Sequence, residues 1–340
     1  MSEKPIVVGI TQGDINGISY EVITKTLMDS RMMEVCMPVV YGSSKVASYH
    51  RKLIKNVADF SFHIIKQAEQ VSHKNPNMIN IVEKEIKIEM GESTPIAGEM
   101  AVASLKMAIE DMLAKKIDVL VTSPVNKKNF QSESFTFPGQ TEYLAQTCKT
   151  SDYLMLTIAD GLKIGTITTH YALSEISNEL KKELIVKKIQ ILNKSLEQDF
   201  LITKPKIAVL SLNPHVGESG KFGKEEQNII VPAIEEAFNH GIYVFGPYAA
   251  DGFFGTGQYN KFDAVLAMYH DQAMIPFNVL AYGEGVNFTA GLPFVRTSPA
   301  HGTAYDIAGK DMASPDSFRN AVYLACDIYR NRQQSIKNKQ

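Results

Sequence analysis

Apolar runs that end in polar residues recur along the chain, and they predict buried strands of a parallel sheet. Three of these runs, residues 162–170, 206–215 and 261–270, end on a histidine. Two more, residues 5–11 and 117–122, lead into the polar segments QGDING and SPVNKK. The pattern therefore predicts at least five strands that carry polar residues at their exits.

Helical segments lie between the predicted strands. They cover residues 19–28, 98–115, 174–197 and 225–240, and a last helix with a basic tail follows residue 311. Alternating strands and helices are typical of a doubly wound α/β architecture. Residues 60–92 interrupt this alternation with short pieces such as NMINIVEKEIKIE, which predict a hairpin or an edge-strand excursion.

The strand-terminal histidines, His170, His215 and His270, indicate a metal-dependent enzyme. Ligands of open α/β sheets bind beyond the carboxyl ends of the strands, so three imidazoles at such ends would converge on one crevice. Three neutral imidazoles and an open position form a catalytic site for zinc or another borderline divalent ion. A single histidine at a strand end is usually an ordinary surface or core residue, so the inference depends on the recurrence.

The residues beside these histidines are polar. Asn213 precedes His215 by two positions, and Asp271 and Gln272 follow His270 directly. Their amide and carboxylate groups could orient an imidazole or a metal-bound water. The histidines at positions 50, 63, 73 and 240 lie in polar or helical contexts and receive no role.

A glycine-rich turn in residues 9–17, GITQGDING, precedes a predicted helix. Free N–H groups at a helix start can bind an anion or a substrate, and Asp14 and Asn16 would then be candidate contacts. A tight turn that needs glycine for its dihedral angles explains the same residues. The spacing matches neither GxGxxG nor a P-loop, so both interpretations stay open.

Two further segments carry candidate chemistry. Residues 282–310 are rich in glycine and polar side chains, and Arg296 could clamp a phosphate or carboxylate with two hydrogen bonds. The alternative is a glycine-rich connection with one solvated arginine. Residues 137–143, FPGQTEY, form a turn that enters a helix, with Thr141 as a possible N-cap.

Composition restricts the partners. Lysine plus arginine (35) nearly balances aspartate plus glutamate (37) in 340 residues, so we expect neither nucleic acid nor an anionic membrane as a partner. No apolar run reaches the roughly 18 residues of a membrane span, and the amino terminus lacks a secretory pattern. Cys36, Cys148 and Cys326 are scattered, as is typical of reduced thiols in a cytoplasmic protein.

The motifs GITQGDINGI, TSPVNK, FPGQTEYLA, TTH, LNPH, YHDQ and GVNFTAGLPFVRTSPAHGTAYDIAGK resemble the 4-hydroxythreonine-4-phosphate dehydrogenase family of vitamin B6 biosynthesis. The resemblance covers nearly the whole chain in the expected order. The segment HGTAYDIAGK is also similar to the adenosine-side cofactor loop of isocitrate and isopropylmalate dehydrogenases. The resemblance implies their fold: an α/β homodimer with two lobes around a cleft and active sites at the subunit interface. It suggests one lobe at about residues 1–135 plus 290–340, and a second with metal ligands and dimer contacts at 136–289.

The resemblance also implies roles for individual residues. The metal ligands would be His170, His215 and His270, drawn from both subunits, with the third coming across the dimer. The candidate substrate contacts are Gln140, Thr141, Asn278, Asn287 and Arg296. Two of them depart from the family, which usually has histidine at position 140 and lysine at position 278. The adenosine half of NAD or NADP would lie on His301, Gly302, Thr303, Ala304 and Asp306.

The implied reaction is oxidation of 4-phosphooxy-threonine to a β-keto acid, which decarboxylates to 3-amino-2-oxopropyl phosphate. The metal would be zinc, with cobalt, nickel, manganese or magnesium as alternatives. Asp251 and Asp271 are the candidate acid–base residues, and a metal-bound hydroxide is a further possible base. The two departures leave other functions open. These are the same chemistry on a 4-phosphorylated threonate or erythronate, a phosphate acyltransferase-like enzyme, and a homologue that has lost catalysis.

Overall fold

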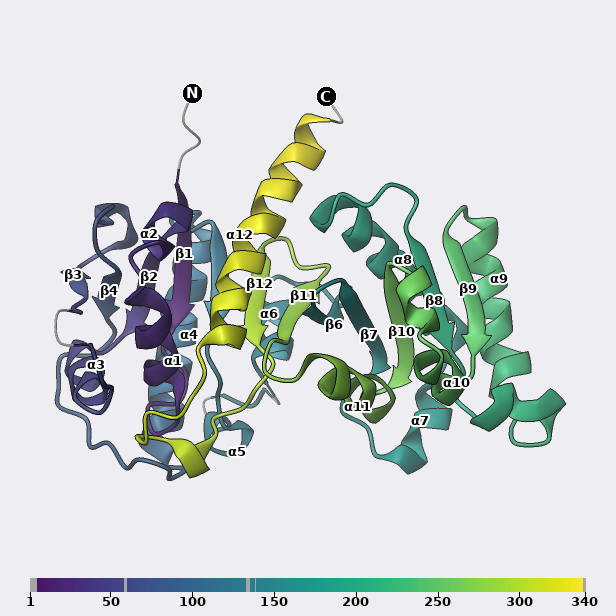
Figure 1. The fold of residues 1–340 in the computed structure, drawn as a ribbon, viewed down its shortest axis with the longest axis horizontal. Helices are drawn as coiled ribbons and strands as arrows, with labels where there is room; N and C mark the ends of the chain where they lie inside the picture. Colours follow the sequence, from purple (N-terminus) through teal and green to yellow (C-terminus); the bar gives the residue numbers. More distant parts are fainter. Residues whose placement is uncertain (1–4, 58–59, 133–134, 138, 339–340) are drawn as a thin grey trace. The chain divides into compact units, whose positions relative to one another are not determined.

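The computed structural model describes residues 5–57, 60–132, 135–137 and 139–338. The chain is an α/β protein in which strands and helices alternate, as the hydrophobic pattern predicts (Figure 1). It divides into two compact units, residues 1–149 with 293–329 and residues 150–292 with 330–340. None of the helices among the described residues has the length and apolar character that a membrane crossing requires.

The first unit contains parallel strands in the order β3-β4-β2-β1-β5-β12. Their bounds are β3 His63–Ile65, β4 Asn77–Asn80, β2 Cys36–Gly42, β1 Ile6–Thr11, β5 Val119–Thr122 and β12 Val295–Pro299. Every residue of β1, β2, β5 and β12 is buried, because helices cover both faces of a parallel sheet. This burial explains why these strands read as continuous apolar runs in the sequence.

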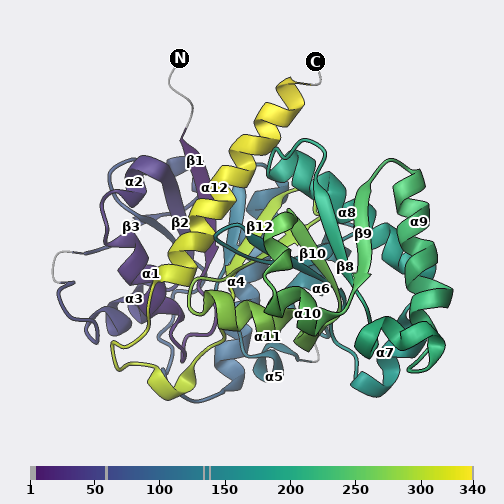
Figure 2. The same ribbon diagram turned by 45° about the vertical axis from the view of Figure 1, so that its right-hand side comes forward.

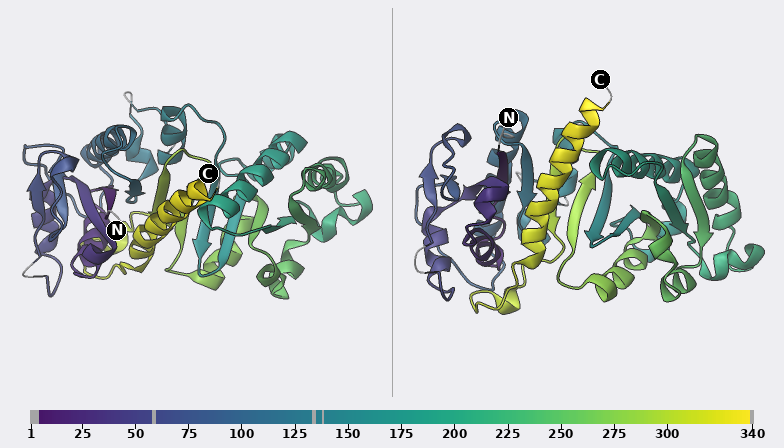
Figure 3. Two further views of the ribbon diagram at one scale, coloured as in Figure 1. Left: turned by 90° about the horizontal axis from the view of Figure 1, so that it is seen from above. Right: turned by 45° about the horizontal axis from the view of Figure 1, so that its top comes forward.

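The helical elements of the first unit are α1 Ser19–Leu27, α2 Met32–Val35, α3 Ser44–Arg51, η1 Ala68–Gln70, α4 Pro95–Leu113, α5 Lys127–Phe130, α6 Gln140–Thr147, η5 Tyr305–Ile307 and the first part of α12 Asp316–Lys337. From above, α4 lies on one face of the sheet and α12 on the other (Figure 3). Thr297 of β12 donates a hydrogen bond to Ala321 O of α12 at 2.8 Å. Since side chains alternate along a strand, Arg296 lies on the face opposite α12.

The second unit has the strand order β11-β6-β7-β10-β8-β9. Their bounds are β11 Val286–Ala290, β6 Leu154–Ala159, β7 Leu162–Thr168, β10 Ala264–Tyr269, β8 Lys206–Leu210 and β9 Tyr243–Tyr248. The pairs β11·β6 and β6·β7 are antiparallel, whereas β7, β10, β8 and β9 run parallel to one another. The three predicted strands that lead to histidines are therefore adjacent and point the same way.

The helical elements of the second unit are α7 Leu173–Glu179, α8 Lys182–Asp199, η2 Pro214–Gly220, η3 Glu226–Ile230, α9 Val231–Asn239, α10 Ala250–Gly255, η4 Gln258–Lys261 and α11 His270–Ala281. Phe253 of α10 and Phe277 of α11 belong to one apolar cluster with Ala208, Leu210 and Val265 of the sheet. Both helices therefore cover the same face of β8 and β10 (Figure 2).

One local prediction is wrong, and another is correct in only one of its two alternatives. The single helix expected at residues 174–197 is two helices, α7 and α8, because buried Leu180 has an extended backbone and ends α7. The hairpin expected within residues 60–92 is a parallel pair, β3 and β4, at the edge of the sheet. The edge-strand alternative is therefore correct and the hairpin is wrong. Alternation of side chains predicts a strand but not the direction in which it runs.

A buried histidine supports the turn that follows β1. His50 of α3 is 2% exposed, and its Nε2 lies 2.8 Å from Ile15 O. The Tyr20 ring stacks on the imidazole with 5.3 Å between the ring centroids. Burial lowers the pKa of His50 to about 4, while the hydrogen bond to Ile15 acts in the opposite direction. At neutral pH the uncharged ring therefore donates Nε2–H to the Ile15 carbonyl.

We expect the free energy of unfolding to fall as the pH decreases from about 6.5 towards about 4. In this range His50 takes up a proton in the unfolded chain and stays neutral in the folded one, so acid favours unfolding. The change is about 2–3 kcal/mol between pH 7 and pH 4.5. Urea titrations at both pH values should show a smaller change for His50→Gln, which keeps an N–H donor but does not titrate. An equal pH dependence in the two proteins would contradict the assignment.

Candidate active site

The histidines at the strand ends lie at one edge of the second unit's sheet. His170 follows the end of β7 by two residues, His270 directly follows β10, and His215 follows the end of β8 by five. Because β7, β10 and β8 are neighbouring parallel strands, their carboxyl ends share this edge. All three imidazoles are exposed. The recurrence in the sequence thus corresponds to adjacent positions in the fold.

The three histidines do not form a closed ligand set within the part of the chain that the structure describes. Among the described residues, no group of three or more His, Cys, Asp or Glu side chains could hold a metal ion. The family resemblance implies that the third histidine comes from a second subunit.

The chemistry of the donor set fits a borderline divalent ion. His270 Nδ1 lies 2.8 Å from Asp271 Oδ1. When Nδ1–H donates to this carboxylate, the lone pair of Nε2 points away from it and can bind a metal. Asp271 is therefore placed where its carboxylate can orient the His270 ring.

Side chains also join the exits of the three strands. Thr168 Oγ1 at the end of β7 donates to Met268 O of β10 at 2.7 Å. The Gln272 amide accepts from Met268 N at 2.8 Å and donates to Ser211 O, after β8, at 2.7 Å. Gln272 therefore holds backbone groups instead of an imidazole or a water. This role could not be predicted from the sequence, because both partners are backbone atoms.

Asp251 lies at the same edge of the second unit. It is an exposed residue in the first turn of α10, which follows β9, the parallel neighbour of β8. Its role as an acid or base stays a prediction.

The first unit contains a buried arginine, Arg296. Arg296 is 4% exposed, and its Nε and Nη2 donate to Thr122 Oγ1 at 3.0 and 2.7 Å. Its Nη1 donates to Thr141 Oγ1 at 3.2 Å. Burial lowers the pKa of Arg296 to about 10, and the charge of Glu142 acts in the opposite direction. The guanidinium therefore stays charged at neutral pH, and the solvated arginine considered from the sequence is wrong.

Gln140 and Ser123 present unsatisfied polar atoms beside these threonines. Gln140 is 9% exposed, and its Nε2 donates to Ser123 O at 3.1 Å. Its Oε1 and the Ser123 hydroxyl are buried and have no hydrogen-bond partner among the described residues. A buried acceptor without a donor is costly, so a ligand with an N–H or O–H group would suit Gln140. The helix begins here with Gly139 as its N-cap, so the N-cap predicted at Thr141 is wrong.

The two asparagines predicted as substrate contacts belong to the second unit. Asn287 lies on β11, and its Oδ1 accepts from Thr157 Oγ1 at 3.3 Å. Asn278 is exposed on α11, two turns beyond His270. Arg296, Gln140 and Thr141 lie together in the first unit.

The predicted cofactor loop rests on the turn after β1. Ile18 N donates to Thr303 O at 3.1 Å, and a Cβ on Gly17 would lie 2.7 Å from the same oxygen. Tyr305 OH donates to Asp14 Oδ2 at 2.7 Å. The Asn16 amide bonds to residues 89–94. These contacts favour the structural interpretation of the glycine-rich turn: it holds the loop instead of a ligand.

His301 at the start of this loop offers a lone pair. Its Nδ1 lies 3.0 Å from Gly302 O, and burial lowers the pKa of the imidazole. Its Nε2 is buried without a partner among the described residues. A neutral ring that donates through Nδ1 leaves Nε2 as an acceptor, which an amino group or a ribose hydroxyl could satisfy. Gly302 and Asp306 are exposed, while Thr303 and Ala304 are half-buried.

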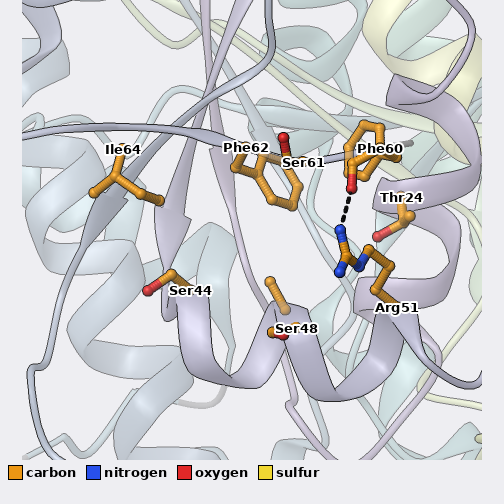
Figure 4. Close-up of a pocket in the computed structure, with 9 residues that line it drawn as sticks. Thr24, Ser44, Ser48, Arg51, Phe60, Ser61, Phe62 and Ile64 are labelled. Atoms are coloured by element: carbon orange, nitrogen blue, oxygen red, sulfur yellow. Dashed lines mark hydrogen bonds between the residues drawn. The ribbon is translucent and has the colours of Figure 1, made fainter. Parts of the chain in front are cut away.

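A separate cavity of about 200 Å³ lies in the first unit between α3 and residues 60–64 (Figure 4). Arg51 and Phe60 both line this cavity, and Arg51 Nη1 donates a hydrogen bond to Phe60 O at 2.6 Å. None of the site residues predicted from the sequence lines this cavity.

The fold agrees with solved structures. A 4-hydroxythreonine-4-phosphate dehydrogenase from Klebsiella pneumoniae superposes with a TM-score of 0.82 at 33% identity, over 97% of this chain and 99% of that one. An isocitrate dehydrogenase from Methylococcus capsulatus superposes with a TM-score of 0.52 at 10% identity, over 98% of this chain and 88% of that one. The predicted isocitrate dehydrogenase-like α/β fold is confirmed.

Sequence comparison identifies the family. A 4-hydroxythreonine-4-phosphate dehydrogenase of Bacteroides thetaiotaomicron is 51% identical over 334 residues, which cover 98% of this chain and 91% of the relative. A protein of Oceanobacillus iheyensis named "Putative D-threonate 4-phosphate dehydrogenase" is 39% identical over 332 residues, 96% of this chain and 99% of the relative. The family model described as "Pyridoxal phosphate biosynthetic protein PdxA" matches residues 34–325. The chain therefore belongs to the PdxA family.

Proposed function

We propose that this protein is a metal-dependent, NAD(P)-linked dehydrogenase that acts on 4-hydroxythreonine 4-phosphate. Hydride leaves the carbon that bears the 3-hydroxyl for the nicotinamide, and the hydroxyl proton passes to a base. The resulting β-keto acid loses carbon dioxide, the carbon that bore the carboxylate takes up a proton, and the product is 3-amino-2-oxopropyl phosphate. The observation that carries the proposal is family membership together with three histidines at the exits of neighbouring parallel strands.

A divalent ion held by His170, His215 and the His270 of a second subunit would act as a Lewis acid on the substrate oxygen during both steps. Zinc suits three imidazoles, and cobalt, nickel, manganese or magnesium are alternatives. Asp271 would orient the His270 ring through its contact with Nδ1 and direct Nε2 towards the cation. Asp251, exposed after β9, is our candidate for the group that takes the proton.

Arg296 would bind the substrate phosphate, because a buried guanidinium presents several parallel N–H donors. Thr122 and Thr141 already hold the guanidinium through their hydroxyls. Gln140 Oε1 would accept a hydrogen bond from the substrate ammonium or hydroxyl group. Unlike the histidine usual at this position in the family, Gln140 cannot transfer a proton near neutral pH.

The remaining predicted contacts have separate tasks. Asn287 and Asn278 would donate hydrogen bonds to the phosphorylated substrate. The asparagine at position 278 lacks the charge of the usual lysine, and a lost charge-assisted contact corresponds to about 1.5–3 kcal/mol. The loop from His301 to Asp306 would bind the adenosine half of NAD or NADP, with Nε2 of His301 as an acceptor.

A second candidate substrate is threonate 4-phosphate, which carries a hydroxyl in place of the amino group. The name of the Oceanobacillus iheyensis relative favours it. Gln140 Oε1 accepts a hydrogen bond from either group, so the side chain alone does not discriminate. Erythronate 4-phosphate is the diastereomeric alternative. A phosphate acyltransferase-like enzyme would have no use for three histidines at strand exits.

We expect the purified protein with Zn²⁺ or Co²⁺ to reduce NAD⁺ or NADP⁺ with 4-hydroxythreonine 4-phosphate at a higher kcat/KM than with threonate or erythronate 4-phosphate. Absorbance at the reduced-nicotinamide band measures the rate, and a chelator should abolish it because the metal polarises the reacting oxygen. Turnover of only the hydroxy acids would reassign the substrate. No turnover in the wild type, with activity in Gln140→His/Asn278→Lys, would identify a homologue that has lost catalysis.

The Arg296→Met variant should raise the KM for the phosphorylated substrate by about tenfold to a hundredfold, since a charge-assisted contact contributes 1.5–3 kcal/mol. The KM for the nicotinamide cofactor should change little. Initial-rate kinetics with each substrate varied in turn separates the two effects. Arg31→Met, which removes an exposed arginine, is the matched control. Equal substrate KM values in the three proteins would refute phosphate binding by Arg296.

We also propose that the protein is a homodimer in which α11 contacts the partner. His270 begins this helix, and its exposed apolar side chains include Ile275 (64%), Val279 (79%) and Leu280 (47%), followed by Tyr282 (88%). Exposed apolar side chains that lie this close together along one helix often mark an interface between proteins. Dimerisation at this helix would bring His270 to a second subunit.

The double variant Ile275→Asp/Val279→Asp should therefore be a monomer, because two carboxylates in an apolar interface are strongly unfavourable. Light scattering coupled to size-exclusion chromatography measures the mass, and metal titration should show weakened binding. Leu113→Asp changes an exposed leucine (52%) in the first unit and should stay dimeric. A dimeric double variant would exclude α11 from the interface.

We assign the reaction to the cytoplasm. The three cysteines form no disulfide, as is usual in a reducing compartment.

A further inference from the structure

The loop that carries His215 has an unusual backbone. Residues 215–219 all have positive φ, between 41° and 73°, and only Gly217 among them lacks a side chain. Each of the four residues other than glycine is disfavoured by roughly 1–2 kcal/mol relative to the right-handed conformation. Consecutive left-handed residues therefore persist only where the surrounding structure holds them.

A buried carboxylate holds the beginning of this loop. Glu226 is 2% exposed, and its Oε1 accepts the backbone N–H groups of Leu212 and Asn213 at 2.9 and 2.7 Å. Its Oε2 accepts from the Asn213 side-chain amide at 3.0 Å. A Cβ on Gly217 would lie 2.7 Å from Oε2, so the left-handed turn closes directly over the carboxylate. These contacts fix the backbone on both sides of His215.

The adjacent glutamate extends the contacts to the His170 loop. Glu225 Oε2 accepts from the Asn213 amide at 2.8 Å, and Oε1 accepts from Ser177 Oγ at 2.5 Å. Ser177 lies in α7, the helix that follows His170. The hydrogen bond from Ser177 lowers the pKa of Glu225, so this carboxylate is ionised at neutral pH. Asn213 thus contacts both glutamates, and Ser177 joins them to the other loop.

We propose that Glu226 and Glu225 are positioning residues that hold the His170 and His215 loops in the arrangement that binds a divalent cation. The proposal rests on the proposed function, because it takes these histidines as metal ligands. In this role neither glutamate would contact the substrate or the cation directly. Each acts through Asn213 or Ser177, and through the backbone beside His215.

The contacts predict a graded series of variants. Glu226→Ala removes all three acceptor contacts and frees the left-handed turn. Glu226→Gln keeps an oxygen that can accept from the Leu212 and Asn213 N–H groups. Its new NH2 group, however, would face the NH2 group of Asn213, and two donors cannot form a hydrogen bond with each other. Ser177→Ala leaves the turn intact and cuts only the connection to α7.

Titration of the full-length, metal-free protein with Co²⁺ tests the proposal. Calorimetry gives the Kd, and the visible absorption of bound Co²⁺ reports its coordination geometry. We expect Glu226→Ala to weaken Co²⁺ binding by roughly tenfold to a hundredfold, as removal of groups that orient metal ligands typically does. Glu226→Gln and Ser177→Ala should weaken it less, with an altered spectrum. Glu235→Ala removes an exposed glutamate of the following helix and should match the wild type.

The thermal midpoint of each metal-free variant separates positioning from stability. A purely structural role would lower the midpoint while folded protein bound Co²⁺ with the wild-type Kd and spectrum, and that result would overturn the proposal. If Glu226→Ala does not fold, Glu226→Gln and Ser177→Ala carry the test, and Kd values within twofold of wild type in both would refute it. Wild-type protein that binds no Co²⁺ would overturn the metal site itself, and this inference with it.

Discussion

Parallel pairing of β7, β10 and β8 is the constraint on which the chemistry of this protein depends. Parallel strands end at the same edge of a sheet, so the residues that follow them become neighbours although they are far apart in the sequence. The three strand-terminal histidines come to lie along one edge of the sheet in this way. An antiparallel arrangement of the same strands would send adjacent exits to opposite edges and separate the imidazoles.

Buried carboxylates hold the loops beside both candidate sites. Asp14 in the first unit accepts from Asn16 N, Asn129 Nδ2 and Tyr305 OH. Glu226 in the second unit likewise accepts from three donors. A buried carboxylate requires several donors, because leaving its oxygens unpaired away from water is strongly unfavourable. These hydrogen bonds therefore hold the loops that supply the donors, and they also restrict the positions of the candidate binding residues on the same loops.

The strands were predictable because burial on both faces leaves a continuous apolar run, which β1, β5, β8 and β10 all have. The direction of β3 relative to β4 was not, since side-chain alternation is the same in parallel and antiparallel pairs. The break between α7 and α8 was not predictable either. No glycine or proline marks it, and it depends on Leu180 leaving the helix to become buried.

From the sequence alone one could tell which chemical groups this protein has and at which positions of the chain they lie: histidines at strand ends, an arginine in a glycine-rich segment, and the motifs of its family. The tertiary structure decided which groups hold them. Tyr305 meets Asp14 across 291 positions, and Arg296 meets Thr122 across 174. Hydrogen bonds act over about 3 Å, so such partners are defined only when folding brings distant segments together.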